Sequence, residues 1–261
     1  MRLRTLRDVC SGATCMKLIA TMIQRLPPSS PVWEACRLLH DILCRKGQLG
    51  HMRYRNIFLG RYNAVYFPIP KVACSSLKVL CARNLSLPLD GAAHLDDTIH
   101  EVNFPYLTPH ELRADHSSYC RFCFVRNPWD RLLSCYSDKV DAAELAANFE
   151  RYGVFRPRMP FHDFVEQVCR VPDAIADGHF RSQSSFVTDR DGRLMVDFVG
   201  KLESLCEDLK RLSEQTCLNV EFVPHLRKTA KRAYQERYCR RTRDLVARKY
   251  HRDVELFDYD F

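Results

Sequence analysis

The stretch YFPIPKVACSSLKVL, Tyr66–Leu80, constrains the fold of this chain more than any other feature. It passes from an apolar strand through a proline-flanked turn into a helix, with one lysine and two adjacent serines at the junction. A short loop between a strand and a helix directs several backbone N–H groups and the helix dipole at one point, and such a point binds an anion. We therefore expect a site for a phosphate or a related anion here, with Lys71, Ser75 and Ser76 as additional donors.

A second strand-to-helix junction follows in YCRFCFVRNPWDRLLSCYSDKV. The nearly continuous apolar run of Tyr119–Arg126 is typical of a strand covered on both faces, and a helical pattern follows Pro128. Ligands of parallel α/β sheets bind beyond the carboxyl ends of the strands, so we expect both junctions at the same edge. Arg126 at the strand end and Ser134 in the next helix can then hold a second phosphate, a nucleotide's length from the first.

Strands alternate with helices along the rest of the chain. Asn63–Pro70 is rich in β-forming residues, Ser75–Asn84 has a helical pattern, and Leu194–Leu205 contains a third strand that leads into a helix. This alternation predicts an α/β, three-layer, P-loop-like domain with a central, mainly parallel sheet flanked by helices. We place this domain at residues 51–261 and an N-terminal helical extension at residues 1–50.

The first junction lacks the glycines of a Walker-type loop, G-x-x-x-x-G-K-S/T. The nearest glycines are Gly60 and Gly91, and no strand ends in an aspartate-rich segment suited to magnesium. A nucleoside-triphosphate hydrolase is therefore disfavoured, and we expect no metal. The lone C-x-x-C pair, Cys120 and Cys123, is expected on opposite faces of a strand, which disfavours shared metal ligation.

Charge and cysteine content bear on partners and compartment. The net charge is +8, and Glu221–Asp253 holds eleven Lys/Arg against four Asp/Glu. That segment suits nucleic acid, an anionic membrane face or an anionic small ligand, and charge alone does not choose among them.

The thirteen cysteines are scattered along the chain. We therefore expect most of them to be reduced and buried, as small hydrophobic side chains of a cytoplasmic protein. No secretory signal or membrane span is evident, and a weak peripheral membrane contact of the N-terminal segment is left open.

The two junctions resemble motifs of the sulfotransferases. PKVACSSLK is similar to their 5′-phosphosulfate loop, and FVRNPWDRLLSCYSDK is similar to the 3′-phosphate-binding segment R-x-P-x-x-R-L-x-S-x-Y of the Golgi-type carbohydrate sulfotransferases and their bacterial relatives. Three further stretches match in order: DGHFRSQ resembles H-W-x-P-Q, DFVGKLESLCEDL resembles Y-D-F-(V/I)-G-K-x-E, and YHRDVELFDYDF resembles Y-x-x-D-x-x-L-F-x-Y. The resemblance, to sulfotransferase family 2, runs from Arg55 to Phe261.

The resemblance implies transfer of a sulfuryl group from 3′-phosphoadenosine 5′-phosphosulfate (PAPS) to a hydroxyl of a carbohydrate or glycolipid, without a metal. By analogy with phosphoryl transfer, catalysis would rest on in-line positioning and electrostatic stabilisation. Lys71 would donate to the bridging oxygen as the S–O bond breaks. Arg126 and Ser134 would hold the 3′-phosphate; Arg131 would assist, or is simply an exposed helix residue. The remaining loop residues would hold the 5′-phosphosulfate oxygens: Val72, Ala73, Cys74, Ser75 and Ser76.

The acceptor hydroxyl also needs a general base within reach of the sulfuryl group. Four histidines lie between the two motifs, where related sulfotransferases often place residues that face the acceptor: His94, His100, His110 and His116. His179 follows in DGHFRSQ. His179 and His94 are our candidates for the base, with Asp97 and Glu101 behind them, and an ordinary surface or core histidine is the alternative for each.

The chain also departs from the family pattern. Phe180 stands in place of the tryptophan of H-W-x-P-Q and Ser182 in place of its proline, so acceptor recognition is expected to differ. Neither the membrane anchor nor the disulfides of the Golgi enzymes are evident, which favours a cytoplasmic, bacterial-type enzyme. Two other classes stay open: a non-catalytic binding protein with the nucleotide fold, and a nucleic-acid-binding protein that uses Glu221–Asp253. The latter would show a steep salt dependence of its affinity for DNA or RNA.

Overall fold

The computed structural model describes residues 56–89, 98–107, 118–150, 152–189, 191–222 and 234–261. They fall into two compact units, of which one comprises Arg53–Cys135 with Gly178–Phe261 and the other includes Tyr136–Asp177. The predicted domain at residues 51–261 stays a prediction. The predicted N-terminal extension, residues 1–50, lies outside the described residues.

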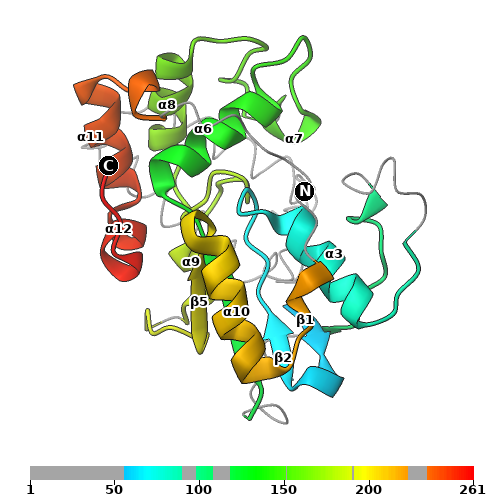
Figure 1. Cartoon of the computed structure of the whole chain (residues 1–261). Coiled ribbons are helices and arrows are strands. Elements are labelled where there is room, and N and C mark those ends of the chain that lie inside the picture. Colours follow the sequence, from blue (N-terminus) through cyan, green and yellow to red (C-terminus); the bar gives the residue numbers. More distant parts are fainter. Residues whose placement is uncertain (1–55, 90–97, 108–117, 151, 190, 223–233) are drawn as a thin grey trace, which may run out of the picture. The chain divides into compact units, whose positions relative to one another are not determined.

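The first unit is built on a five-stranded sheet in the order β3-β1-β2-β4-β5 (Figure 1). Its strands are β1 (Asn56–Leu59), β2 (Ala64–Tyr66), β3 (Tyr106–Leu107), β4 (Cys120–Val125) and β5 (Phe198–Lys201). β2, β4 and β5 run parallel, whereas β1 is antiparallel to both of its neighbours, β2 and β3. The α/β class is therefore confirmed, with a mixed sheet whose three parallel strands end at one edge.

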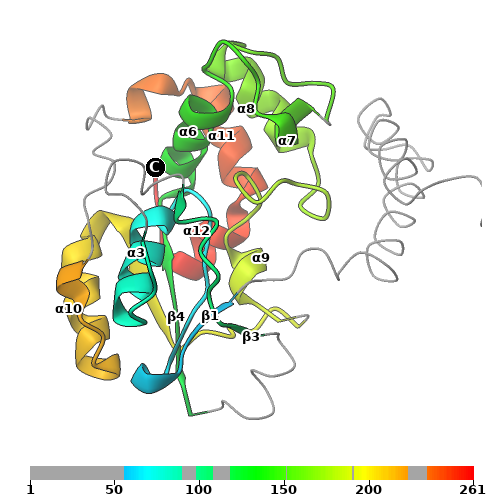
Figure 2. The same ribbon diagram turned by 90° about the vertical axis from the view of Figure 1, so that its right-hand side faces the viewer.

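Helices cover both faces of this sheet. α3 (Cys74–Asn84) and α10 (Leu205–Thr216) lie on one face, and α9 (Ser184–Val187) lies on the other (Figure 2). α11 (Arg240–Lys249) and α12 (His251–Phe257) follow near the end of the chain. Short 3-10 turns occur at Gly60–Tyr62, Leu202–Ser204, Val220–Phe222 and Tyr234–Arg237. α3 and α10 thus confirm the two helices that the sequence predicted after β2 and β5.

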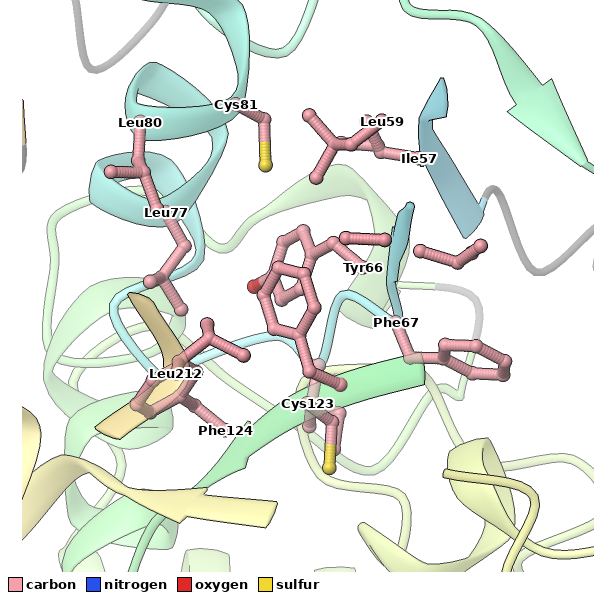
Figure 3. Close-up of a cluster of buried hydrophobic side chains, with 14 of the residues drawn as sticks. Ile57, Leu59, Tyr66, Phe67, Leu77, Leu80, Cys81, Cys123, Phe124 and Leu212 are labelled. Atoms are coloured by element: carbon pink, nitrogen blue, oxygen red, sulfur yellow. The ribbon is translucent and has the colours of Figure 1, made fainter. Parts of the chain in front are cut away.

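A buried apolar core joins α3 to the sheet (Figure 3). Tyr66 lies at its centre, Leu77 descends from α3, and Leu212 comes from α10. Gly200 of β5 pairs in register with Phe124 of β4, and a side chain at Gly200 would overlap the Phe124 ring. This register therefore requires a glycine opposite Phe124.

The other unit contains the C-terminal part of α6 (Pro128–Lys139), α7 (Ala147–Glu150) and α8 (Phe161–Arg170). Its core is aromatic, and the ring of Tyr136 packs against two phenylalanines of α8. The Tyr136 hydroxyl donates to the Met159 carbonyl at 2.7 Å. Tyr136, the last residue of the second motif, is therefore a buried core residue of this unit.

Nine cysteines lie in the described ranges, and none of these nine forms a disulfide. Three are buried (Cys81, Cys123 and Cys135), three are half-buried and three are exposed. The expectation that the cysteines are mostly buried is therefore wrong for this part of the chain. Among the helices of the described ranges, none is long and apolar enough to cross a membrane. A cytoplasmic location stays a prediction.

Candidate active site

The two strand-to-helix junctions lie side by side at the carboxyl edge of the sheet. β2 and β4 are parallel neighbours, so the chain leaves both strands at the same edge. Nη1 of Arg126 donates to the backbone carbonyl of Lys71 at 3.3 Å, which joins the two junctions directly. The structure thus brings Lys71 and Arg126 together, while their roles toward a ligand stay predictions.

The loop before α3 holds two non-glycine residues in the left-handed region of backbone conformation. Lys71 has a φ of 69° and Ala73 a φ of 48°. This conformation costs an L-residue about 1–2 kcal/mol, and such strain concentrates at ligand-binding loops. A left-handed residue beside right-handed ones turns successive N–H groups toward one point. The first internal bond of α3 joins the Leu77 N–H to the Ala73 carbonyl at 2.9 Å, so the N–H groups of residues 74–76 have no acceptor within the helix.

The Cys74 thiol hydrogen-bonds the hydroxyl of Tyr66, the last residue of β2. Burial raises the pKa of Cys74, against the lowering effects of Lys78, the Tyr66 hydrogen bond and Lys71. Burial also raises the pKa of Tyr66 well above its ordinary value. Both groups therefore stay protonated near neutral pH. The Cys74 side chain thus contacts the last residue of β2, and contact of its backbone N–H with an anion stays a prediction.

Arg126 is buried, with 8% of its surface exposed, and Asp130 orients its guanidinium. Nε of Arg126 donates to Oδ2 of Asp130 at 2.8 Å, in addition to the Nη1 bond to the Lys71 carbonyl. A guanidinium has five N–H donors, so these contacts fix its plane and use two of the five. An arginine held in this way can bind phosphate oxygens through the rest of its fork. Ser134 lies further along α6 and is half-buried.

Arg131 is 2% exposed, so its interpretation as an exposed helix residue is wrong. Its guanidinium donates to three backbone carbonyls. Nε contacts the carbonyl of Pro70 at 2.9 Å, Nη1 that of Arg181 at 2.7 Å and Nη2 that of Gly178 at 2.8 Å. Arg131 thereby ties the start of the first loop to the Gly178–Arg181 segment, and this geometry makes it a positioning residue. Direct contact with a 3′-phosphate stays a prediction.

His179 lies within the segment that Arg131 holds near the first loop. It is half-buried and follows Gly178, whose carbonyl accepts from Arg131. On the other side of His179, the carbonyl of Phe180 accepts a hydrogen bond from the Tyr250 hydroxyl at 2.6 Å. The other predicted base, His94, lies outside the described residues, as do Asp97, His110 and His116. The assignment of the base therefore stays a prediction.

The structure brings His100 to the first junction. Nε2 of His100 lies 3.2 Å from Oγ of Ser75, and Nδ1 lies 2.9 Å from Nζ of Lys78. Among the four histidines between the motifs, the sequence favoured His94 and assigned His100 no separate role. Its one signal was the three-residue spacing of Ser75 and Lys78, which places both on one face of α3. No local pattern indicated which residue that face would meet.

Later segments brace the second junction. Oε1 of Gln183 accepts the Arg126 N–H at 2.9 Å, and Nε2 of Gln183 donates to the Arg126 carbonyl at 2.8 Å. Oε1 of Glu203 accepts the Asn127 N–H at 2.7 Å, and Nδ2 of Asn127 donates to the Asp260 carbonyl at 2.7 Å. Gln183, Glu203 and Asp260 belong to the three supporting motifs, and the sequence assigned none of these three residues a role. The structure shows that they hold the backbone that carries Arg126.

Asp253 in turn holds Gln183 in place. Its carboxylate is fully buried and accepts the backbone N–H of Gln183 at 2.7 Å and that of Ser184 at 2.8 Å. Burial raises the pKa of Asp253, although hydrogen bonds from Ser184 and Gln183 and the charge of Arg131 act in the opposite direction. A chain of contacts thus runs from Asp253 through Gln183 to Arg126.

The fold and the site together define an α/β protein with two strand-to-helix junctions at one sheet edge and no Walker glycines. A model of the Sulfotransferase family matches residues 55–260 of the chain. The protein therefore belongs to the sulfotransferase family, and the resemblance inferred from the motifs is confirmed.

Curated relatives of this family carry carbohydrate sulfotransferase names. Carbohydrate sulfotransferase 14 of Homo sapiens is 28% identical over an alignment 293 residues long, gaps included, which covers 99% of this chain and 68% of the relative. The Mus musculus protein of that name is 28% identical over 252 residues, covering 90% of this chain and 58% of the relative. Carbohydrate sulfotransferase 11 of Rattus norvegicus is 27% identical over 172 residues, 56% of this chain and 48% of the relative. This chain thus spans 58% to 68% of the first two relatives. No solved structure matches it significantly.

Proposed function

We propose that the protein is an enzyme that transfers a sulfuryl group from PAPS to a hydroxyl of a carbohydrate or glycolipid. The observation that carries this proposal is the meeting of two strand-to-helix junctions at one sheet edge, where Nη1 of Arg126 donates to the Lys71 carbonyl at 3.3 Å. Two such junctions match the two phosphate-bearing ends of the donor. The carbohydrate sulfotransferase names of the relatives support the acceptor class.

The donor set of the site fits an anionic ligand. The N–H groups at the start of α3, the hydroxyls of Ser75 and Ser76, and the ammonium of Lys71 suit the oxygens of a 5′-phosphosulfate. Arg126, with Ser134 further along α6, suits a 3′-phosphate. Because Asp130 and the Lys71 carbonyl already fix the plane of the Arg126 fork, little side-chain entropy remains to be lost on binding.

In the proposed reaction, the acceptor hydroxyl oxygen bonds to sulfur while the bond between sulfur and the 5′-phosphate oxygen breaks in line with it. The products are a sulfate ester and adenosine 3′,5′-diphosphate. The hydroxyl proton passes to a base, for which His179 and His94 are the candidates. Lys71 donates to the bridging oxygen as negative charge develops there, and the preformed N–H groups of the loop stabilise that charge.

The test is a calorimetric titration of adenosine 3′,5′-diphosphate into the wild-type chain, Arg126→Ala and Lys71→Ala. Arg126→Ala should lower the affinity roughly 10- to 100-fold, the effect of losing a hydrogen bond to a charged group. Lys71→Ala should keep much of the binding and lose transfer, because Lys71 acts mainly on the breaking bond. Arg193→Ala is the matched control, since its side chain is 81% exposed in the loop before β5 and the same charge is removed.

A transfer assay with sulfur-labelled PAPS and a panel of glycans and glycolipids completes the test. Label in a glycan supports the proposal, and loss of label in Lys71→Ala supports the role of that residue. Absence of adenosine 3′,5′-diphosphate binding by the folded wild type would overturn the proposal. Binding without transfer to any hydroxyl would favour the non-catalytic binding protein, and steeply salt-dependent binding of DNA or RNA would favour the nucleic-acid-binding alternative.

A further inference from the structure

We propose that His100 and Lys78 are positioning residues that direct the Ser75 hydroxyl toward the 5′-phosphosulfate group of the donor. This inference rests on the proposed function. It starts from two contacts that His100 makes with one face of α3, one on each ring nitrogen. Nδ1 lies 2.9 Å from Nζ of Lys78, and Nε2 lies 3.2 Å from Oγ of Ser75.

The contact with Lys78 determines which nitrogen of a neutral His100 ring carries the hydrogen. A lysine ammonium has three donors and no acceptor, so a ring nitrogen at hydrogen-bond distance from it must accept. Nδ1 therefore presents its lone pair to Lys78, and the hydrogen of the neutral ring lies on Nε2. Nε2–H then donates to Oγ of Ser75, at 3.2 Å.

This bond orients the Ser75 hydroxyl. A serine hydroxyl has one hydrogen and two acceptor lone pairs. Once His100 donates to one lone pair, the hydroxyl hydrogen is directed away from the ring. Ser75 is the second residue of α3, at the helix start that faces the anion-binding loop. The hydroxyl is thereby prepared to donate to an anion in that loop.

Two ammonium groups lie near this helix start. Lys71 and Lys78 both act electrostatically to lower the pKa of the Cys74 thiol, against the larger effect of burial, so Cys74 lies within the field of both charges. Lys78 therefore does more than fix the histidine tautomer. Its charge also raises the positive potential at the loop, which favours an anionic ligand.

The same geometry separates this role from general-base catalysis. A base must present a lone pair to the proton of the acceptor hydroxyl. In the structure Nδ1 of His100 lies at hydrogen-bond distance from Nζ of Lys78, and Nε2 lies at that distance from Oγ of Ser75. His100 is therefore placed to orient a donor for the ligand, and its substitution should change ligand affinity.

The experiment uses the full chain and three ligands: adenosine 3′,5′-diphosphate, PAPS without acceptor, and adenosine 3′-monophosphate, which lacks the 5′ group. His100→Asn removes the donor near Nε2, whereas His100→Gln places an amide N–H near that position. We expect His100→Asn and Ser75→Ala each to weaken the first two ligands roughly fivefold to tenfold, the effect of one net hydrogen bond. Binding of adenosine 3′-monophosphate should stay unchanged, and His100→Gln should restore most of the affinity.

Two further variants sharpen the result. On a Ser75→Ala background, His100→Asn should cost nothing more, because the two residues act through one contact. Lys78→Met should weaken the two ligands with a 5′ group, whereas Lys210→Met, the same change at an exposed position of α10, should not.

The proposed function fails separately from this inference, since it fails if the wild type binds none of the three ligands. If the wild type binds, three results would overturn the inference. These are equal loss of all three ligands in His100→Asn, unchanged affinities in that variant, and, in the transfer assay with sulfur-labelled PAPS and an acceptor, loss of kcat alone in both His100→Asn and His100→Gln. The last result would make His100 a general base.

Discussion

The side-chain amide of Gln183 bonds both backbone groups of Arg126, although the two residues are 57 positions apart in the chain. It accepts the Arg126 N–H at 2.9 Å and donates to the Arg126 carbonyl at 2.8 Å. The contact continues the hydrogen bonding of β4 one residue past Val125, its last residue. Because Gln183 is fully buried, the backbone that carries the Arg126 guanidinium is held at the point where the strand ends.

Gln183→Leu removes both of these bonds while it keeps an apolar side chain of similar size. It leaves a buried N–H and a buried carbonyl of Arg126 without this partner, at about 1–3 kcal/mol for each group. We expect a lower free energy of unfolding in urea and weaker binding of adenosine 3′,5′-diphosphate by calorimetry. Gln235→Leu, at an exposed position, is the control. Wild-type stability and affinity in Gln183→Leu would show that the amide does not hold Arg126.

Asp253 should give the protein a pH-dependent stability that Asp253→Asn lacks. Burial raises the folded-state pKa of Asp253, so between about pH 4 and that raised pKa the folded state binds more protons than the unfolded state. Stability contributed by this group therefore decreases as the pH rises through this window. The advantage of the wild type over Asp253→Asn in free energy of unfolding should shrink correspondingly.

The measurement is urea unfolding of the wild type and Asp253→Asn at several pH values from about 4 upward, starting near the ordinary pKa of an aspartate. Asp191→Asn serves as the control, because that side chain is 73% exposed and should leave the difference flat. An advantage that grows with pH would mean that hydrogen bonds from Gln183 and Ser184 outweigh the effect of burial on the Asp253 pKa.

The sequence predicted the parts of the site that local patterns specify. An apolar strand, a short polar loop and a helical run are each visible in consecutive residues, so both junctions were placed correctly relative to β2 and β4. The parallel pairing of these strands followed from the alternation of strands and helices. Lys71 and Arg126 meet for that reason, since each follows one of two neighbouring strands.

Non-local contacts escaped the sequence for a physical reason. β3 has only two residues and exists because it pairs with β1, which no period in its own residues reveals. Arg131 follows the pattern of an exposed helix position, but its charge is satisfied by carbonyls of two distant loops. His100 meets α3 only through folding. Side chains of this kind are recognised from their partners rather than from their neighbours in the chain.

Ala73 should tolerate glycine and reject valine. Its φ of 48° lies in the left-handed region, where glycine has no steric cost and a β-branched residue has a large one. In Ala73→Gly, relief of this strain is offset by the greater freedom of the unfolded chain, so stability should change by less than about 1 kcal/mol. Ala73→Val should destabilise by more than that and distort the loop.

Thermal unfolding and calorimetry of both Ala73 variants provide the test. Weaker binding of adenosine 3′,5′-diphosphate in Ala73→Val, with near-wild-type binding in Ala73→Gly, is the expected result. Val72→Ala removes two methyl groups at the neighbouring buried position, where φ is not positive. It therefore serves as the control for an effect of altered packing alone. Equal behaviour of Ala73→Gly and Ala73→Val would show that the loop does not depend on this backbone conformation.

Arg131→Lys decides between the two roles open to this residue, positioning and direct phosphate binding. A lysine ammonium cannot span the three carbonyls that accept from the Arg131 fork. Since at least one carbonyl then loses its partner in the interior, we expect a loss of about 2–4 kcal/mol in the free energy of unfolding. Arg170→Lys, at a side chain that is 60% exposed, should leave stability unchanged.

An Arg131→Lys variant with intact stability and weak binding only of ligands that bear a 3′-phosphate would instead make Arg131 a direct ligand of that group. Loss of stability together with weaker binding of adenosine 3′-monophosphate and adenosine 5′-phosphosulfate alike would establish Arg131 as the residue that positions both junctions.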